Sequence, residues 1–207
     1  MLSILLTKNK INMKKEKTLL ILGAGGHGKS VAEAALLSGD WEKIVFIDDR
    51  WPKIKNIFNF PVISNIKKID QLKLSVHGAI AAAGNNTLRE KWQSAIINAN
   101  LLLISVIHPS AFVSKSAHIG PGSAIMAQAM IGVDARLGTG TIINANTTLD
   151  HDAYVGDFAH LGIGVQIAGG VRVGARAWLQ AGCCAGYCVD IPAGQLVPPG
   201  TALIANK

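Results

Sequence analysis

The chain has 207 residues, of which 49% are hydrophobic and 16% charged, a globular composition that leaves room for one large or two small domains and excludes extensive disorder. Its formal net charge of +7 is compatible with nucleic acid, an acidic membrane surface or anionic small molecules as partners. The basic residues are scattered outside 8–17 and no aromatic side chains are interleaved with them. We therefore expect polyanionic substrates and no nucleic acid.

Residues 1–16 are expected to form a flexible extension. Their apolar run, Leu2 to Leu6, is too short for the core of a signal peptide or for a membrane span, and Met13 offers an alternative start. Every other apolar run of membrane length is interrupted by Gly, polar or charged residues. We expect a cytoplasmic protein without membrane insertion.

Residues 17–106 alternate apolar runs with helical segments, which predicts an α/β domain of parallel βαβ units. The predicted strands are Thr18–Leu22, Lys43–Ile47, Gly78–Ala83 and Leu101–Val106. One predicted helix follows a glycine-rich segment and ends at Gly39, and the other runs from about Asn86 to Ala99.

The glycine-rich segment is GAGGHGK at 23–29, between the first strand and the first helix. Gly23, Gly25 and Gly28 fit G-x-G-x-x-G, and Asp48 follows twenty residues after Gly28, which by itself indicates dinucleotide binding. The domain is only about 85 residues long, enough for one mononucleotide half of such a fold. Because glycines let backbone N–H groups approach a phosphate at a helix N-terminus, we predict a nucleotide-diphosphate pocket. The alternative is a turn that serves only close helix–strand packing.

Two other features belong to the same edge of the predicted sheet. His27 lies inside the glycine loop, either as a hydrogen-bonding loop residue or as a ligand contact. Gly84-Asn85-Asn86 follows the third strand. Ligands of open α/β sheets bind at the carboxyl ends of the strands, so both loops are expected to line one pocket.

From Ile107 onward the chain repeats itself every six residues. An aliphatic residue recurs at each sixth position as far as Val197, interrupted only by Ala185, and a small or β-branched residue follows four positions later. Six is the period of a parallel β-helix, which we predict for residues 107–207. Glycine often follows the aliphatic residue directly, and Gly or Asn is expected at the corner that needs a positive φ.

Three cysteines lie close together in the repeats, at Cys183, Cys184 and Cys188. Their spacing is not that of a zinc knuckle, and an odd number suits a reducing compartment. Cys183 occupies the small interior position of its repeat and is expected to be a buried structural thiol.

Polar residues stand out among the repeats at Asn144, at 150–152 (Asp-His-Asp) and at His160. Three hexapeptides make one triangular coil, so residues eighteen apart should stack about 4.8 Å apart along the axis. Gly169 is therefore expected over His151. His160 belongs to another corner and can meet His151 only if subunits pack about a threefold axis, which predicts an active site between subunits.

A histidine flanked by two carboxylates is suited to act as a general base, because a carboxylate fixes its tautomer and supports the imidazolium that forms. A solvated, charged corner is the alternative. The spacing of His118, His151 and His160 does not match the histidines of the zinc-dependent gamma carbonic anhydrases, so no metal is expected.

The chain resembles the sialic-acid O-acetyltransferase / bacillosamine N-acetyltransferase group of hexapeptide-repeat enzymes from about Lys17 to Gly200. The resemblance rests on six segments: GAGGHGK at 23–29, FIDD at 46–49, GNN at 84–86, IHPSA at 107–111, LDHDAYVGDFAH at 149–160 and AGG at 168–170. It implies a small Rossmann-like α/β domain before a left-handed β-helix, a homotrimer, and acetyl-CoA as donor. Members that use a UDP-linked 4-amino-4,6-dideoxy sugar hold its uridine diphosphate on the N-terminal domain.

The resemblance also implies roles for single residues. His151 corresponds to the family's general base, Asp152 to its acidic neighbour, and Gly169 to a backbone donor toward the thioester carbonyl. The implied contacts with the nucleotide-sugar are Gly25, Gly26, His27, Asp48, Asp49, Gly84, Asn85 and Asn144. The implied contacts with acetyl-CoA, in a cleft between subunits, are His160, Gly169, Ala181 and Gly182.

The chain departs from the family in two places. Asp152 replaces the usual Glu, and TALIANK stands where many relatives have a Gly-x-Pro-Ala-Lys segment that closes over coenzyme A. We expect acetyl-CoA-dependent N-acetylation of the C4 amine of a UDP-linked 4-amino-4,6-dideoxy sugar, in a bacillosamine-type pathway. The alternatives are O-acetylation of sialic acid or a related sugar, a non-catalytic nucleotide-sugar-binding β-solenoid, and a dehydrogenase.

Overall fold

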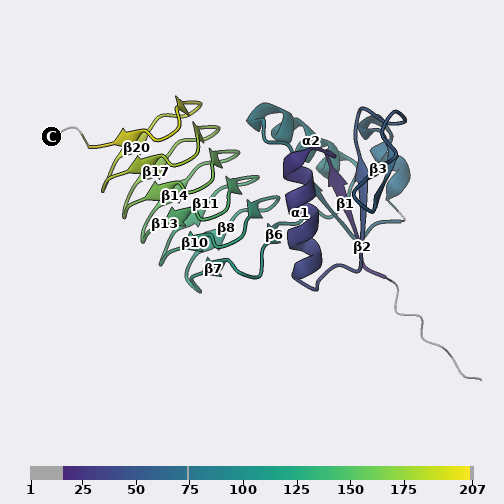
Figure 1. The fold of residues 1–207 in the computed structure, drawn as a ribbon, viewed down its shortest axis with the longest axis horizontal. Coiled ribbons are helices and arrows are strands. Elements are labelled where there is room, and N and C mark those ends of the chain that lie inside the picture. The colour runs from purple at the N-terminus through teal and green to yellow at the C-terminus, as the bar shows by residue number, and fades with distance from the viewer. Residues whose placement is uncertain (1–15, 74, 206–207) are drawn as a thin grey trace, which may run out of the picture.

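The computed structural model describes residues 16–73 and 75–205, which form an α/β domain and a parallel β-helix packed against it (Figure 1). The extension expected at 1–16 lies outside the described residues, apart from residue 16. No helix within the described ranges is long and apolar enough to cross a membrane.

The sheet of the α/β domain has the strand order β3-β4-β2-β1-β5. Its parallel strands are β1 (Thr18–Leu22), β2 (Lys43–Ile47), β4 (Phe60–Ser64) and β5 (Gly78–Ala81), and β3 (Asn56–Ile57) pairs antiparallel with β4. The helices are α1 (Gly26–Leu37), α2 (Asn86–Asn98) and the 3-10 helix η1 (Ile66–Leu72). Successive residues of β1 point to opposite faces, so alternate residues pack with α1 in one core and with α2 and η1 in another.

The predicted strand at Leu101–Val106 is wrong. Only Leu103 forms a bridge, with Ala79, because the chain touches the edge of the sheet at this one point and then turns into the first coil of the β-helix. The third strand ends at Ala81, two residues earlier than predicted. The sequence patterns also did not predict η1 and the β3–β4 hairpin, which lie between the second and third predicted strands.

The β-helix has three walls of two-residue strands. The first wall consists of β6 (Val106–Ile107), β9 (Ala124–Ile125), β12 (Ile142–Ile143), β15 (His160–Leu161), β18 (Trp178–Leu179) and β21 (Leu196–Val197). The second consists of β7 (Phe112–Val113), β10 (Met130–Ile131), β13 (Thr148–Leu149), β16 (Gln166–Ile167), β19 (Cys184–Ala185) and β22 (Ala202–Leu203). The third consists of β8 (His118–Ile119), β11 (Arg136–Leu137), β14 (Tyr154–Val155), β17 (Arg172–Val173) and β20 (Asp190–Ile191).

Partners within each wall are eighteen residues apart, as in the pairing of Leu149 with Ile167, so the predicted coil is confirmed. The aliphatic series faces inward and is buried from Ile125 to Val197. Positive φ falls not on the glycine that directly follows the aliphatic residue but two positions later, where the expected Gly or Asn occurs in some repeats (Gly140, Asn146) and other residues in the rest, such as Asp152. The first glycine is needed because the next coil lies close, and a Cβ on Gly120 would meet the backbone of Gly138.

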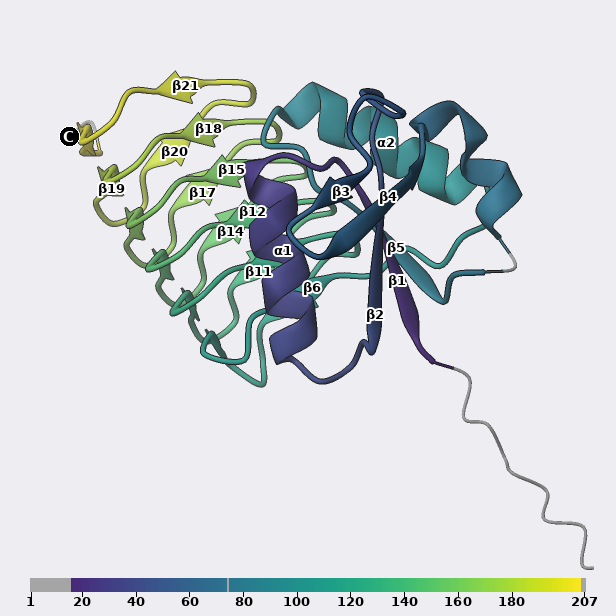
Figure 2. The ribbon, with the colours of Figure 1, turned by 45° about the vertical axis from the view of Figure 1, so that its right-hand side comes forward.

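The α/β domain lies against the first wall and the corner between the third and first walls (Figure 2). Val106 and Ala124 of the first wall share a hydrophobic core with Val31 of α1. α2 follows the corner, where Arg89 donates to the carbonyl of Gly140. In a triangular coil, the corner between the second and third walls is opposite the first wall, and therefore opposite this domain.

Candidate active site

A cleft of about 410 Å³ opens at the carboxyl edge of the sheet, between the loops that follow β1, β2 and β5. It brings together the seven N-terminal residues predicted to contact a nucleotide-sugar: Gly25, Gly26, His27, Asp48, Asp49, Gly84 and Asn85. The cleft also has an apolar side, formed by Leu88 and Trp92 of α2. The sequence motifs thus converge on one concave site.

The glycine loop leads directly into the N-terminus of α1. Gly25 is the N-cap residue, so no side chain caps the helix, and the first turn contains no acidic residue. A Cβ on Gly26 would meet no atom within 4 Å, so the cleft is open at this point. Uncapped N–H groups and the helix dipole together favour an anion here.

Asp48 ties this loop to β2. Its carboxylate accepts hydrogen bonds from the backbone N–H of Ala24 at 2.8 Å and from Nε and Nη2 of Arg50 at 2.8 and 2.9 Å. The side-chain bond from Arg50 is the main reason that the pKa of Asp48 falls to about 2. Since these partners occupy both carboxylate oxygens, Asp48 shapes the cleft, and the neighbouring exposed Asp49 is freer to meet a ligand. Sequence spacing did not single out Arg50.

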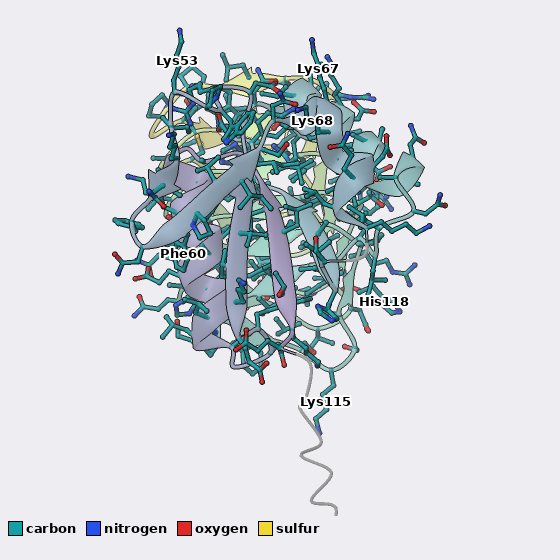
Figure 3. The ribbon with its side chains drawn as sticks, turned by 90° about the vertical axis from the view of Figure 1, so that its right-hand side faces the viewer. Lys53, Phe60, Lys67, Lys68, Lys115 and His118 are labelled. Carbon is teal, nitrogen blue, oxygen red and sulfur yellow. The ribbon has the colours of Figure 1, made fainter. Side chains whose placement is uncertain are left out.

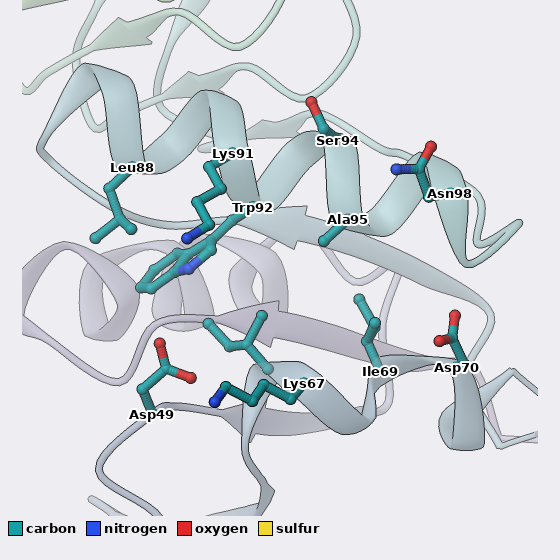
Figure 4. Close-up of a pocket in the computed structure, with 11 residues that line it drawn as sticks. Asp49, Lys67, Ile69, Asp70, Leu88, Lys91, Trp92, Ser94, Ala95 and Asn98 are labelled. Carbon is teal, nitrogen blue, oxygen red and sulfur yellow. The ribbon is translucent and has the colours of Figure 1, made fainter.

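A second cavity of about 630 Å³ continues from the cleft and shares Asp49, Leu88 and Trp92 with it (Figure 4). Lys67 and Lys91 line it from its two sides. Lys53, Lys67 and Lys68 all project from the same side of the domain, at the top of Figure 3. The cavity itself is lined by two aspartates, Asp49 and Asp70, as well as by the two lysines, so its lining is of mixed charge.

His151 lies at the corner between the second and third walls, and its side chain is exposed. Its Nδ1 lies 2.7 Å from Oδ2 of Asp152, and this hydrogen bond, with the charges of Asp150 and Asp152, raises the pKa of His151. The Nδ1–H of the neutral ring donates to the carboxylate, which leaves the lone pair on Nε2. Asp152 has φ 59°, a conformation that Asp tolerates well, and the shorter side chain does reach the imidazole.

Gly169 follows His151 by one coil and lies directly over its ring. A Cβ on Gly169 would come within 2.6 Å of Cε1 and Nε2 of His151, so no larger residue fits without moving the imidazole. The stacking deduced from the eighteen-residue spacing is therefore confirmed. The backbone at Gly169 lies next to the nitrogen that carries the lone pair.

His160 lies on the first wall, next to the cleft of its own chain. Its Nδ1 donates to the carbonyl of Gly84 at 3.1 Å, and its ring stacks on Trp178 with centroids 5.6 Å apart. Burial, followed by the charge of Arg89, lowers the pKa of His160 to about 4. The pKa of His27 is lowered to about 3, first by burial, then by the charge of His160 and then by that of Arg89.

The other predicted residues lie on different corners. Asn144 accepts a hydrogen bond from the N–H of Ala145 at 2.9 Å, at the corner between the first and second walls. Ala181 and Gly182 are exposed two coils further along the same corner. A single chain therefore does not bring Asn144, His160, Ala181 and Gly182 to His151.

The three cysteines are free thiols, with Cys183 buried as expected and Cys184 and Cys188 exposed. Among residues 16–73 and 75–205, no group of three or more His, Cys, Asp or Glu side chains is placed to hold a metal ion.

Residues 18–96 match the family of the PglD N-terminal domain. A UDP-N-acetylbacillosamine N-acetyltransferase of Bacillus subtilis (strain 168) is 33% identical over 116 residues, which cover 54% of this chain and 52% of that protein. The match therefore spans about half the length of this curated relative.

Two solved structures extend the likeness to almost the whole chain. The acetyltransferase domain of PglB from Neisseria gonorrhoeae FA1090, in complex with acetyl coenzyme A, is 33% identical with a TM-score of 0.81, over 92% of this chain and 97% of that one. PerB from Caulobacter crescentus, in complex with CoA and GDP-perosamine, is 32% identical with a TM-score of 0.84, over 91% of both chains. The shared fold is the expected α/β domain followed by a left-handed parallel β-helix.

Proposed function

Because the chain belongs to the family of hexapeptide-repeat sugar acetyltransferases that includes the sialic-acid O-acetyltransferases and the UDP-N-acetylbacillosamine N-acetyltransferases, we propose that it transfers the acetyl group of acetyl-CoA to the C4 amine of a UDP-linked 4-amino-4,6-dideoxy sugar. The names of its relatives support this choice. One acts on a UDP-linked bacillosamine, one was solved with acetyl coenzyme A, and one with CoA and an amino sugar linked to GDP.

The stacking of Gly169 over His151 is the observation that carries the proposal. In the proposed reaction the amine attacks the thioester carbonyl, and Nε2 of His151 takes the proton that the amine loses. Oxygen of the tetrahedral intermediate accepts a hydrogen bond from the N–H of Gly169. The intermediate then collapses to the amide, and coenzyme A leaves as the thiolate.

Asp152 supports this step because its Oδ2 accepts a hydrogen bond from Nδ1–H of His151, with 2.7 Å between the nitrogen and the oxygen. The carboxylate keeps the lone pair on Nε2 in the resting ring and stabilises the imidazolium after proton transfer. Asp150 adds negative charge to the same corner, and its Oδ1 accepts a hydrogen bond from the backbone N–H of His151 at 2.7 Å. Together the two carboxylates favour proton uptake by His151.

The nucleotide-sugar occupies the cleft of the α/β domain in this proposal. Its diphosphate faces the uncapped N-terminus of α1 at Gly25, Gly26 and His27, and its ribose or base faces Asp49. Gly84 and Asn85 border the other side of the cleft. The sugar then points toward His160, whose Nδ1 bonds to the Gly84 carbonyl. Residues 17–106 are thus the nucleotide-sugar-binding domain, and 107–207 the acetyltransferase domain.

The position of His151 leads us to propose a homotrimer with active sites between subunits. The cleft borders the first wall, and His151 occupies the opposite corner of the triangular coil. The sugar held by one chain is therefore better placed for the His151 of a neighbour. Asn144, Ala181 and Gly182 lie on another corner, which suits a shared acetyl-CoA cleft.

The test is release of coenzyme A thiol from acetyl-CoA with a panel of UDP- and GDP-linked 4-amino-4,6-dideoxy sugars and free sialic acids. Turnover of a nucleotide-linked amino sugar, inhibited by the free nucleotide diphosphate, is the expected result. His151→Ala should abolish this turnover while acetyl-CoA still binds. Turnover of sialic acid that UDP does not inhibit would instead identify an O-acetyltransferase.

A further inference from the structure

Arg89 joins the nucleotide cleft to the β-helix from a fully buried position. The residue lies in the first turns of α2 and is 1% exposed. Its Nη1 donates to the carbonyl of Ala83 at 2.9 Å, its Nε to Gly140 at 2.7 Å and its Nη2 to Phe158 at 2.6 Å. One guanidinium therefore holds the loop after β5 against two coils of the β-helix.

The charge of Arg89 has no counterion in the described part of the chain. Its acceptors are backbone carbonyls and the side-chain amide oxygen of Asn86. Two other arginines are paired: Arg50 with Asp48 and Arg176 with Glu90. Burial lowers the pKa of Arg89 to about 10, so the group is still charged at neutral pH. A buried, unpaired charge is unfavourable, which points to an anion that the chain itself does not supply.

The two histidines next to this charge, His27 and His160, are neutral, while the nearby carboxylate of Glu90 is paired with Arg176 and that of Asp157 accepts from the N–H of Thr139. His160 is faced by His27 from α1, by Arg89 from α2 and by the uncharged Trp178 from β18. Both imidazoles have pKa values well below neutrality, so neither adds positive charge there. Nε2 of His27 is buried and has no hydrogen-bond partner among the described residues.

The cleft lies directly in front of Arg89. Ala83 and Gly84, whose carbonyls accept from Nη1, both line the cleft, and so does His27. Arg89 itself does not line the cleft, so the Ala83–Gly84 backbone lies between the guanidinium and the cleft. Because Arg89 is buried, its charge is screened less by water than a surface charge would be, and its attraction for an anion in the cleft is stronger.

We propose that Arg89 is a positioning residue of this acetyltransferase: from behind the Ala83–Gly84 backbone, its uncompensated charge holds the diphosphate of the nucleotide-sugar. The inference rests on the proposed function, which supplies the anion. Arg89 touches no reacting atom, and it acts by fixing the diphosphate end of the substrate.

The test compares ligands of increasing charge. We expect Arg89→Met to weaken the binding of UDP about 10- to 100-fold and that of uridine less than about 3-fold, with UMP between them, by calorimetry at pH 8. A role limited to holding the loop would weaken all three equally, and that result would overturn the proposal. Arg176→Met is the matched control, because Arg176 also joins α2 to the β-helix but is paired with Glu90. It should change each affinity less than about 3-fold.

Two measurements keep the proposal testable if Arg89→Met does not fold. Arg89→Lys keeps the charge and loses part of the hydrogen bonding, so this variant should still prefer UDP over uridine. Loss of that preference would contradict the proposal. In the wild type, UDP binding at pH 8 should take up no proton, measured in two buffers of different ionisation heat. Uptake of one proton would show that a protonated histidine, and not Arg89, neutralises the diphosphate, and would overturn the proposal. A wild type that binds neither the uridine nor the guanosine series would contradict the proposed function itself.

Discussion

Gly169 covers the imidazole of His151 so closely that a Cβ on Gly169 would lie 2.6 Å from Nε2. This contact follows from the eighteen-residue coil. Leu149, two residues before His151, pairs with Ile167, two residues before Gly169. In the proposed mechanism, Gly169 thus sets the space in which Nε2 of His151 meets the substrate. The repeat that builds the β-helix therefore also places Gly169 next to the imidazole that is proposed to act as the base.

Gly169→Ala should therefore damage catalysis more than folding. The added methyl group forces the exposed His151 ring to turn away, and it crowds the N–H that is proposed to stabilise the oxyanion. We expect kcat to fall about 100- to 1,000-fold, with acetyl-CoA binding largely kept. Steady-state kinetics and calorimetry measure the two effects.

Gly186→Ala is the control for this change. Gly186 follows on the same corner of the β-helix, where a Cβ would make only an ordinary contact, 3.6 Å from the carbonyl oxygen of Leu203. Its kcat should stay within about 3-fold of the wild type. Equal losses in both variants would show that Gly169 matters only for the coil.

The activity of the wild type should fall as the pH drops through the raised pKa of His151, because the base must be unprotonated. Asp152 is the main cause of the raised pKa. Asp152→Asn removes its charge, so the acid limb of the kcat profile should move to lower pH. The maximal rate should fall about 10- to 100-fold, because the tautomer is no longer fixed by a carboxylate.

Asp134→Asn is matched to this variant, since Asp134 lies eighteen residues earlier at the same corner with a similar φ of 56°. It should leave the acid limb in place. If the acid limb of the kcat profile does not shift in Asp152→Asn, the hydrogen bond between Asp152 and His151 has no part in the mechanism.

Asp48 should contribute stability that depends on pH. Its pKa is lowered from 3.8 to about 2 in the folded protein, so this contribution is present above pH 3.8 and is lost as the pH falls toward 2. Asp48→Asn should lower the melting temperature at pH 7 and flatten its decline in this acid range. The physical reason is loss of the bonds to Arg50 and Ala24.

Asp49→Asn is the comparison, because Asp49 is exposed and adjacent. Its melting curve should follow that of the wild type across the same pH range. An acid decline in Asp48→Asn as steep as in the wild type would assign the loss of stability to other groups.

The sequence predicted well wherever a period or a chain-order rule applied. Strands β1 and β2 have the predicted bounds, and the eighteen-residue spacing alone was enough to predict Gly169 over His151. The loops at 23–29 and 84–86 were expected at one edge of the sheet because parallel strands end there, and they do line one cleft.

Contacts between side chains that no period relates escaped prediction. Arg50 curls back onto Asp48, and Arg89 reaches across from α2 to Gly140, because of rotamers and packing that spacing does not encode. One signal for Arg89 was present: a basic residue near the N-terminus of a helix opposes the helix dipole and needs a reason to be there. Glycine occurs at two positions of the repeat for different reasons, a close neighbouring coil at one and a positive φ at the other, and the sequence alone does not distinguish them.

The proposal of a site shared between subunits can be tested by complementation. His151→Ala lacks the base but keeps the cleft. Gly26→Trp fills the cleft but keeps the base, and Gly26 has open space for a side chain. Each variant should be inactive alone.

In mixed oligomers, a cleft from a His151→Ala chain meets an intact His151 from a Gly26→Trp neighbour. With equal, random mixing, half of the clefts and half of the bases are intact, so we expect about a quarter of the wild-type activity. The measurement is thiol release after co-refolding of the two chains, with mixed trimers verified by mass spectrometry. A mixture no more active than either variant alone would contradict an active site built from two subunits.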